Sequence, residues 1–179
     1  MHSTAPATQP PVGVPWHQAT FVAAFPRFWR GYTTFRGRAA RPEFWWWTLW
    51  WFIITQVAQI PWIIGLVTWR PPAPSASDIA VLDDAFQSYN PFPVWGFLLS
   101  SLPPIAAIGL ALYAAVTLAA ALPWIALALR RLHDSNRSGW WVLLFLVPFG
   151  NVVLIVLLAM PSDERGTRFD PQRSVRADD

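Results

Sequence analysis

Residues 44–69 read FWWWTLWWFIITQVAQIPWIIGLVTW, a run of 26 positions without one Asp, Glu, Lys or Arg. A helix of about 20 apolar residues is enough to cross the hydrocarbon core of a bilayer. Three tryptophans open the run, and Trp62 and Trp69 lie toward its end, as expected of indole rings that favour both membrane–water interfaces. At 1.5 Å per residue, the run from Trp45 to Trp69 measures roughly 36 Å, enough to cross with some tilt. This stretch predicts a first transmembrane helix.

The composition of the whole chain also indicates a membrane protein. Of its 179 residues, 54% are hydrophobic and 13% are charged, whereas a soluble domain carries about 25% charged residues. So little charge cannot cover a soluble surface, and such high hydrophobicity excludes an intrinsically disordered protein. Cysteine is absent, which excludes a disulfide framework and a thiolate metal site. All 13 basic residues are arginines beside apolar stretches, so we expect membrane lipids as partners and no nucleic acid.

A membrane domain is predicted over residues 18–171, with transmembrane spans at about 44–69, 105–129 and 139–160. Residues 85–104 are nearly as apolar, but prolines break them into pieces too short to cross, so they predict a re-entrant or interfacial segment before the second span. Pro148 interrupts the third span, which a membrane helix tolerates where its neighbours satisfy the freed backbone groups. The predicted fold class is an all-α integral membrane bundle of three transmembrane helices.

The two ends of the chain have a different character. Aromatic residues recur near helical spacing between residues 18 and 33, with Arg27 and Arg30 among them, and predict an amphipathic helix that lies in the membrane interface. Residues 1–17 are rich in proline and small polar residues, lack the features of a signal peptide, and predict a disordered tail. Residues 172–179 predict a second disordered tail, which is charged.

The arginines indicate the orientation of the chain. With three spans, the N-terminus and the turn after the second span share one side, and this side carries eight of the 13 arginines. The positive-inside rule then places that side in the cytoplasm. A fourth crossing within residues 85–104 would instead place this turn outside the cytoplasm.

Two basic motifs flank the predicted spans: FRGRAARPEFW at residues 35–45 and RRLHDSNRSGWW at residues 130–141. In the three-span arrangement, both lie at the same interface. Five of their arginines are candidates for a shared patch that binds lipid or phosphate: Arg38, Arg41, Arg130, Arg131 and Arg137. Guanidinium groups bind carboxylates and phosphates through paired N–H donors. Two interpretations stay open: a structural network with Glu43 and Asp134 that joins helix ends, and a pocket for an anionic lipid headgroup.

Both motifs resemble those of a bacterial inner-membrane family, domain of unknown function 805. The family pattern F-x-G-R-x-x-R-x-E-[FY]-W is filled by residues 35–45, and the pattern R-R-L-H-D-x-x-R-S-[GA]-W-W is filled by residues 130–141. The resemblance extends over about residues 20–171. It implies a multi-pass protein of the bacterial inner (plasma) membrane with about three spans, and it implies no biochemical activity. The chain departs from the family pattern at residues 167–170, which read TRFD.

His133 and Asp134 suggest catalysis, but the pattern around them does not support it. No serine nucleophile motif accompanies the pair, and adjacent helical residues point in different directions. We expect His133 to form a hydrogen bond at a helix end, and Asp134 to cap a helix or pair with an arginine. The other histidines, His2 and His17, show no metal-ligand spacing. The sequence therefore predicts no enzyme, no metal site and no cofactor.

The sequence thus predicts a non-enzymatic inner-membrane protein that presents an Arg-rich cytoplasmic surface to anionic lipid headgroups or to a protein partner. The alternative is a subunit of an oligomeric channel or transporter for small solutes. Gln59 and Asn151, inside the predicted spans, would then line a polar path. Three helices are too few to enclose such a path, so this alternative needs a homo-oligomer or a membrane protein partner.

Overall fold

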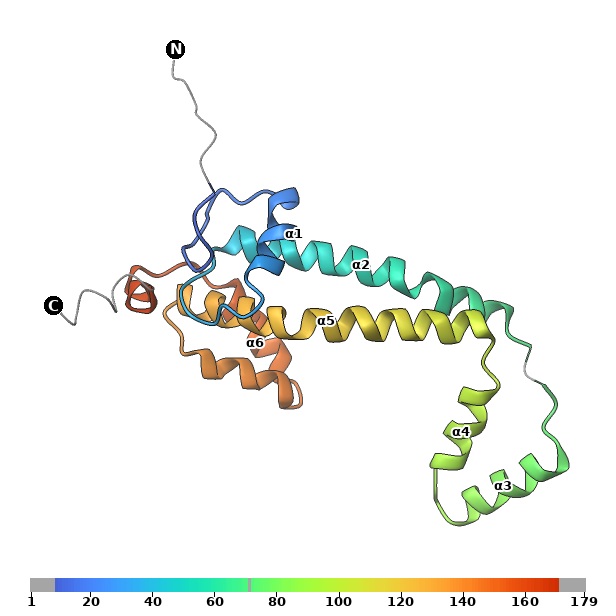
Figure 1. Ribbon diagram of the computed structural model, residues 1–179. Coiled ribbons are helices and arrows are strands. Elements are labelled where there is room, and N and C mark those ends of the chain that lie inside the picture. The colour runs from blue at the N-terminus through green and yellow to red at the C-terminus, as the bar shows by residue number, and fades with distance from the viewer. Residues whose placement is uncertain (1–8, 71, 171–179) are drawn as a thin grey trace. The chain divides into compact units, whose positions relative to one another are not determined.

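The computed structural model describes residues 9–70 and 72–170, and all regular elements in these ranges are helices. In chain order (Figure 1) they are α1 (Phe21–Arg30), α2 (Arg41–Thr68), α3 (Ala76–Gln87), α4 (Phe92–Ser100), α5 (Pro104–Asp134), the 3₁₀ helix η1 (Gly139–Leu146), α6 (Gly150–Ala159) and the 3₁₀ helix η2 (Glu164–Phe169). The predicted tail at 172–179 lies outside the described residues. The chain forms two compact units: Met1–Ile53 with Leu118–Asp179 is unit 1, and Ile54–Thr117 is unit 2.

Two helices, α2 and α5, are long and apolar enough to cross a membrane, as judged by length and composition. They have 28 and 31 residues, or about 42 and 46 Å at 1.5 Å per residue. Only 11% and 17% of their most apolar stretches are buried, so they differ from the buried core helices of soluble proteins. The first two predicted spans are confirmed as long apolar helices.

The third predicted span, residues 139–160, is not one helix, and that prediction was wrong. The segment divides into η1, with eight residues, and α6, with ten. Pro148 cannot donate a backbone hydrogen bond, and Phe149 has a left-handed φ of 60°, so the chain turns between the two helices. The helices η1 and α6 pack on each other so closely that a Cβ at Gly150 would overlap the carbonyl of Leu144. The break is a turn rather than a kink in a spanning helix.

In unit 1, the amphipathic segment forms α1 and packs its aromatic face on α2. The ring of Phe28 stacks on Trp47 with a centroid separation of 3.3 Å, and Phe21 stacks on Trp50 at 4.3 Å. The indole N–H of Trp50 also donates to the carbonyl of Phe21 over 2.7 Å. Trp47 is 1% exposed, so it forms the centre of this small aromatic core.

In unit 2, small residues let two helices approach closely. A Cβ at Gly65 would overlap Ala106, and one at Gly109 would overlap the backbone of Trp62, so α2 and α5 are antiparallel neighbours there. The connection between them carries α3 and α4. With nine residues, α4 is too short to cross a bilayer, which agrees with the expectation that residues 85–104 do not span.

Candidate functional site

The first charged feature of unit 1 is a buried ion pair between Arg27 of α1 and Glu43 of α2. Arg27 Nε donates to Glu43 Oε2, and each side chain is 3% exposed. Glu43 lies in the first turn of α2, and its Oε1 accepts from the backbone N–H of Ala40 over 3.1 Å and of Trp16 over 2.7 Å. One carboxylate therefore caps the start of α2 and joins it to α1 and to the N-terminal segment.

The same arginine contacts the tail that the sequence predicted to be disordered. Arg27 donates to the carbonyl oxygens of Pro10, Pro11 and Val14 over 2.5 to 3.1 Å. Part of the predicted tail at 1–17 thus contacts the rest of unit 1 through residues 10–14, because backbone carbonyls in a proline-rich stretch remain free to accept from a buried guanidinium. Residues 1–8 lie outside the described residues.

A second buried pair lies at the end of α5. Arg131 Nη1 donates to Asp134 Oδ2 over 2.5 Å, and neither side chain is exposed. Arg131 also donates through Nε to the carbonyl of Leu158 over 2.9 Å, and through Nη2 to the carbonyl of Met160. These carbonyls belong to the C-terminal end of α6, where a helix has backbone acceptors without partners of its own. Arg131 thus caps α6 and attaches it to α5.

The arginines of the first basic motif complete this junction. Arg41 donates to the carbonyl of Ala159 through Nη2 over 2.5 Å and through Nε over 3.1 Å, and so caps α6 from the side of α2. Arg38 binds both carboxylate oxygens of Asp170 over 2.7 and 2.8 Å, and its Nη1 lies 3.7 Å from Asp134 Oδ1. The ends of α2, α5 and α6 and the residues after η2 are joined by charged side chains.

Arg130 occupies a different environment from Arg131. It is 1% exposed, and its Nε donates to the carbonyl of Ala126 over 3.2 Å. Its Nη2 has no hydrogen-bond partner among residues 9–70 and 72–170. A Cβ at Gly31 would lie 2.6 Å from this nitrogen, so the guanidinium occupies space that only glycine leaves open.

His133 links three segments by its ring. Its Nδ1 lies 3.1 Å from the carbonyl oxygen of Gly37, and the ring stacks on Phe169 with a centroid separation of 4.1 Å. Phe169 is also contacted by Arg168, whose guanidinium lies 4.6 Å from the Phe169 ring centroid. The Nη2 of Arg168 donates to the carbonyl of Asn136 over 3.4 Å. His133 is thus engaged in packing and a backbone contact.

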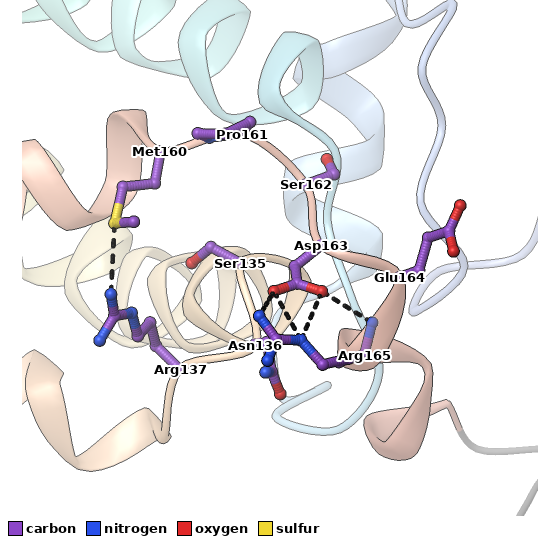
Figure 2. A pocket seen from close by; sticks show the side chains of 9 residues that line it. All are labelled: Ser135, Asn136, Arg137, Met160, Pro161, Ser162, Asp163, Glu164 and Arg165. Atoms are coloured by element: carbon purple, nitrogen blue, oxygen red, sulfur yellow. Dashed lines mark hydrogen bonds and ion pairs between the residues drawn. The ribbon is translucent and has the colours of Figure 1, made fainter.

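A pocket of about 760 Å³ opens beside this junction, between the turn after α5 and the segment after α6. Its lining consists of Ser135, Asn136, Arg137, Met160, Pro161, Ser162, Asp163, Glu164 and Arg165 (Figure 2). Figure 2 shows Arg137 and Arg165 on different sides of the pocket, with Arg165 turned to Asp163 and Arg137 to the sulfur of Met160, 3.9 Å away.

The hydrogen bonds from Arg165 lower the pKa of the Asp163 carboxyl below its ordinary value. Arg137 is exposed and has no carboxylate partner in the described part of the chain.

The structure thus separates the five candidate arginines by their surroundings. Arg38, Arg41 and Arg131 bind protein carboxylates or carbonyls, Arg130 is enclosed, and Arg137 faces the pocket.

Sequence reasoning did not assign Arg27, Ser162 or Asp170 to the site. Arg27 was noticed only as a charge of the amphipathic segment and not as the partner of Glu43, whereas Ser162 and Asp170 lie in a polar stretch that carries no comparable signal. Asn151, expected in mid-span, lies in the first turn of α6, and its Oδ1 accepts from the N–H of Val152 over 2.9 Å.

A family model described as "Protein of unknown function (DUF805)" matches residues 32–171, which include both basic motifs and the junction they build. The chain belongs to the DUF805 family. It is similar to two proteins of Escherichia coli K12. Inner membrane protein YhaH is 49% identical over 51 residues, which are 28% of this chain and 42% of YhaH. Inner membrane protein YhaI is 50% identical over 58 residues, which are 31% of this chain and 49% of YhaI.

The chain therefore spans less than half the length of each of these relatives. No solved structure matches it. Together with the long apolar helices α2 and α5, the relatives identify the chain as a DUF805 protein of the bacterial inner membrane with two candidate transmembrane helices.

Proposed function

We propose that this DUF805 protein is a non-enzymatic membrane protein that crosses the bilayer twice, with α2 and α5, and binds anionic lipid headgroups on its cytoplasmic side. The observation that carries the proposal is the segregation of charge. Ten of the eleven described arginines belong to unit 1, whereas the connection between α2 and α5 holds Arg70 and three aspartates. The positive-inside rule favours unit 1 on the cytoplasmic side, with α1 in the interface.

Contacts of the C-terminal segment strengthen this orientation. The Ser162 hydroxyl donates to Asp134 Oδ2 over 2.5 Å, and the backbone N–H of Asp163 donates to the carbonyl of Asp134 over 2.8 Å. Because these residues meet the C-terminal end of α5, Arg165 and Arg168 join the arginines of the two motifs. The three-span arrangement would have separated them by the thickness of a membrane.

Three exposed arginines are the proposed headgroup ligands: Arg36, Arg137 and Arg168. None of them forms a salt bridge with a carboxylate in the described part of the chain. Each lies beside a residue that these contacts join: Gly37 and Phe169, which follow Arg36 and Arg168, both meet the His133 ring, and Arg168 donates to the carbonyl of Asn136, which precedes Arg137. Each arginine near an anionic membrane surface contributes about 1 kcal/mol to lipid binding.

The test measures the lipids that remain with the purified protein. The triple variant Arg36→Gln, Arg137→Gln, Arg168→Gln should lose phosphatidylglycerol relative to phosphatidylethanolamine by several-fold, as measured by mass spectrometry after extraction in a mild detergent. Arg70→Gln is the matched control, because it removes one charge from the opposite side. Retention of the wild-type lipid ratio by a folded triple variant would show that these arginines do not bind headgroups. An equal loss in Arg70→Gln would show that the binding is not confined to one side.

A further inference from the structure

We propose that residues 139–160, which form η1 and α6, are a re-entrant hairpin that enters the bilayer from the side of the basic motifs, ends within it, and returns to the same side. Its partners are the acyl chains of the lipid leaflet next to unit 1. The inference rests on the proposed crossings of α2 and α5, and it adds a membrane contact that neither of those helices makes.

Both ends of the segment lie at the same end of α5. Its start follows the end of α5 by a short turn, and the Cβ that Gly139 lacks would lie 2.5 Å from Leu129 Cδ2. Its far end is held by Arg131 at the carbonyl of Leu158, and by Asp134 at Ser162. A segment whose two ends are both fixed at one end of a spanning helix cannot itself cross the membrane.

The helix α5 shows how deeply the hairpin reaches. Phe145, near the turn, contacts Trp124 with a ring centroid separation of 5.7 Å. Trp124 precedes Asp134 by ten residues, or about 15 Å along a helix with a rise of 1.5 Å per residue. The α6 helix, with ten residues, has the same length. Because the hydrocarbon core is about 30 Å thick, the turn lies near the middle of the bilayer.

The surface of the hairpin suits lipid. No Asp, Glu, Lys or Arg occurs between Arg137 and Asp163. At the turn, Leu146 is 76% exposed and Phe149 is 86% exposed. The outward face of α6 is apolar as well, and its exposed residues are Val152, Val153, Ile155 and Val156. Such a continuous apolar surface needs an apolar partner. Because the segment is attached beside two helices proposed to cross the bilayer, the hydrocarbon of the lipid is that partner.

Several backbone N–H groups of the turn have hydrogen-bond partners within it. Exposed backbone groups without hydrogen bonds are very unfavourable in hydrocarbon. The N–H of Val147 donates to the carbonyl of Leu144, that of Gly150 donates to Val147, and that of Val152 donates to Phe149 and to the Asn151 side chain. Pro148 has no N–H to satisfy. The one polar side chain near the turn thus serves the turn itself.

The test uses the absence of cysteine from the chain. Single cysteines replace Thr33, Ala80, Glu164 and Leu146 in the full chain, and intact cells and inside-out vesicles are treated with a membrane-impermeant maleimide. We expect Thr33→Cys and Glu164→Cys to react only in the vesicles, and Ala80→Cys only in cells. Leu146→Cys should react in neither preparation, and should react fully after denaturation.

A depth measurement then locates the turn. An NBD label on Leu146→Cys should be quenched by nitroxides on acyl chains and protected from iodide, whereas the same label on Glu164→Cys should show the reverse. If Glu164→Cys is labelled in intact cells, as Ala80→Cys is, residues 139–160 cross the membrane and the hairpin is refuted. Reaction of Leu146→Cys in the vesicles, or its quenching by iodide, refutes the hairpin equally. If Thr33→Cys and Ala80→Cys react from one side, α2 does not cross, and the proposed function fails instead.

Discussion

Arg131 joins more parts of unit 1 than its position at a helix end suggests. Its guanidinium donates to a carboxylate on its own helix and to two carbonyls at the C-terminal end of α6, and its side chain is not exposed to solvent. The planar group of arginine has five donors in fixed directions, and lysine has a single flexible ammonium. The geometry therefore explains why the position needs arginine rather than any positive charge.

Arg131→Gln should strongly destabilise the protein, because removal of one partner from a buried ion pair costs about 3–5 kcal/mol. Arg131→Lys should restore only part of the loss, since an ammonium cannot reach all three acceptors. Thermal unfolding in detergent, followed by size-exclusion chromatography, measures the effect. Arg165→Gln is the control, because its bond to Asp163 is exposed and should contribute little. Equal melting temperatures for Arg131→Gln and wild type would contradict the capping role.

Gly37 is required by its backbone conformation and by a close neighbour. Its φ is +85°, and a Cβ there would overlap the carbonyl of Gly13. Gly37→Ala should cost about 1–3 kcal/mol, the range typical of a residue held in a strained backbone conformation. Gly96→Ala is the matched control, since a Cβ at Gly96 meets nothing within 4 Å. The same thermal measurement applies, and equal losses in the two variants would show that Gly37 has no special role.

The sequence could indicate which residues of the site carry charge, but it could not show the pairing. Glu43 was expected to meet the arginines of the two motifs, and it instead meets Arg27, 16 residues earlier. Such pairing depends on how α1 packs on α2, and no local pattern encodes that packing. The capping of α6 by Arg41 was hidden for the same reason, because its acceptor is a backbone carbonyl 118 residues away.

At the scale of elements, Trp47 is the most buried aromatic residue that attaches α1 to α2. Trp47→Ala should cost about 3–5 kcal/mol and should release α1, because the ring of Phe28 loses its stacking partner. Trypsin should then cut after Arg30 and Arg36 faster than in the wild-type protein in detergent. Trp45→Ala is the control, since Trp45 is 41% exposed and packs its ring on Phe44 of the same helix. An unchanged cleavage rate in Trp47→Ala would show that the other contacts, among them the Phe21–Trp50 stack and the Arg27–Glu43 pair, hold α1 without Trp47.

The elements also show where apolar length is informative and where it is not. The first two spans were predicted at 44–69 and 105–129, and the helices lie at Arg41–Thr68 and Pro104–Asp134. The same criterion did not predict the two short helices of 139–160, because apolar length alone does not show where a helix ends. The difference lies in Pro148 and Phe149, which stop one helix before α6 begins.

At the scale of the whole molecule, the two proposed crossings would place the segment after α6 on the side of the N-terminus. Alkaline phosphatase fused after Asp170 should therefore be inactive in bacteria, and the same enzyme inserted between Pro72 and Ala73 should be active, since it folds only outside the cytoplasm. Green fluorescent protein at the same two positions should give the complementary result. Three spans would make both phosphatase fusions active.

The capping of α6 also has a consequence for biosynthesis. The ribosome delivers Arg41 and Arg131 to the membrane before their acceptors at residues 158–160 have been made. Until translation reaches the C-terminal segment, both guanidiniums must be hydrated or held by headgroups. We expect nascent chains that stop short of residue 150 to be extracted and degraded, because the acceptors that close the junction are translated after the helices that they join.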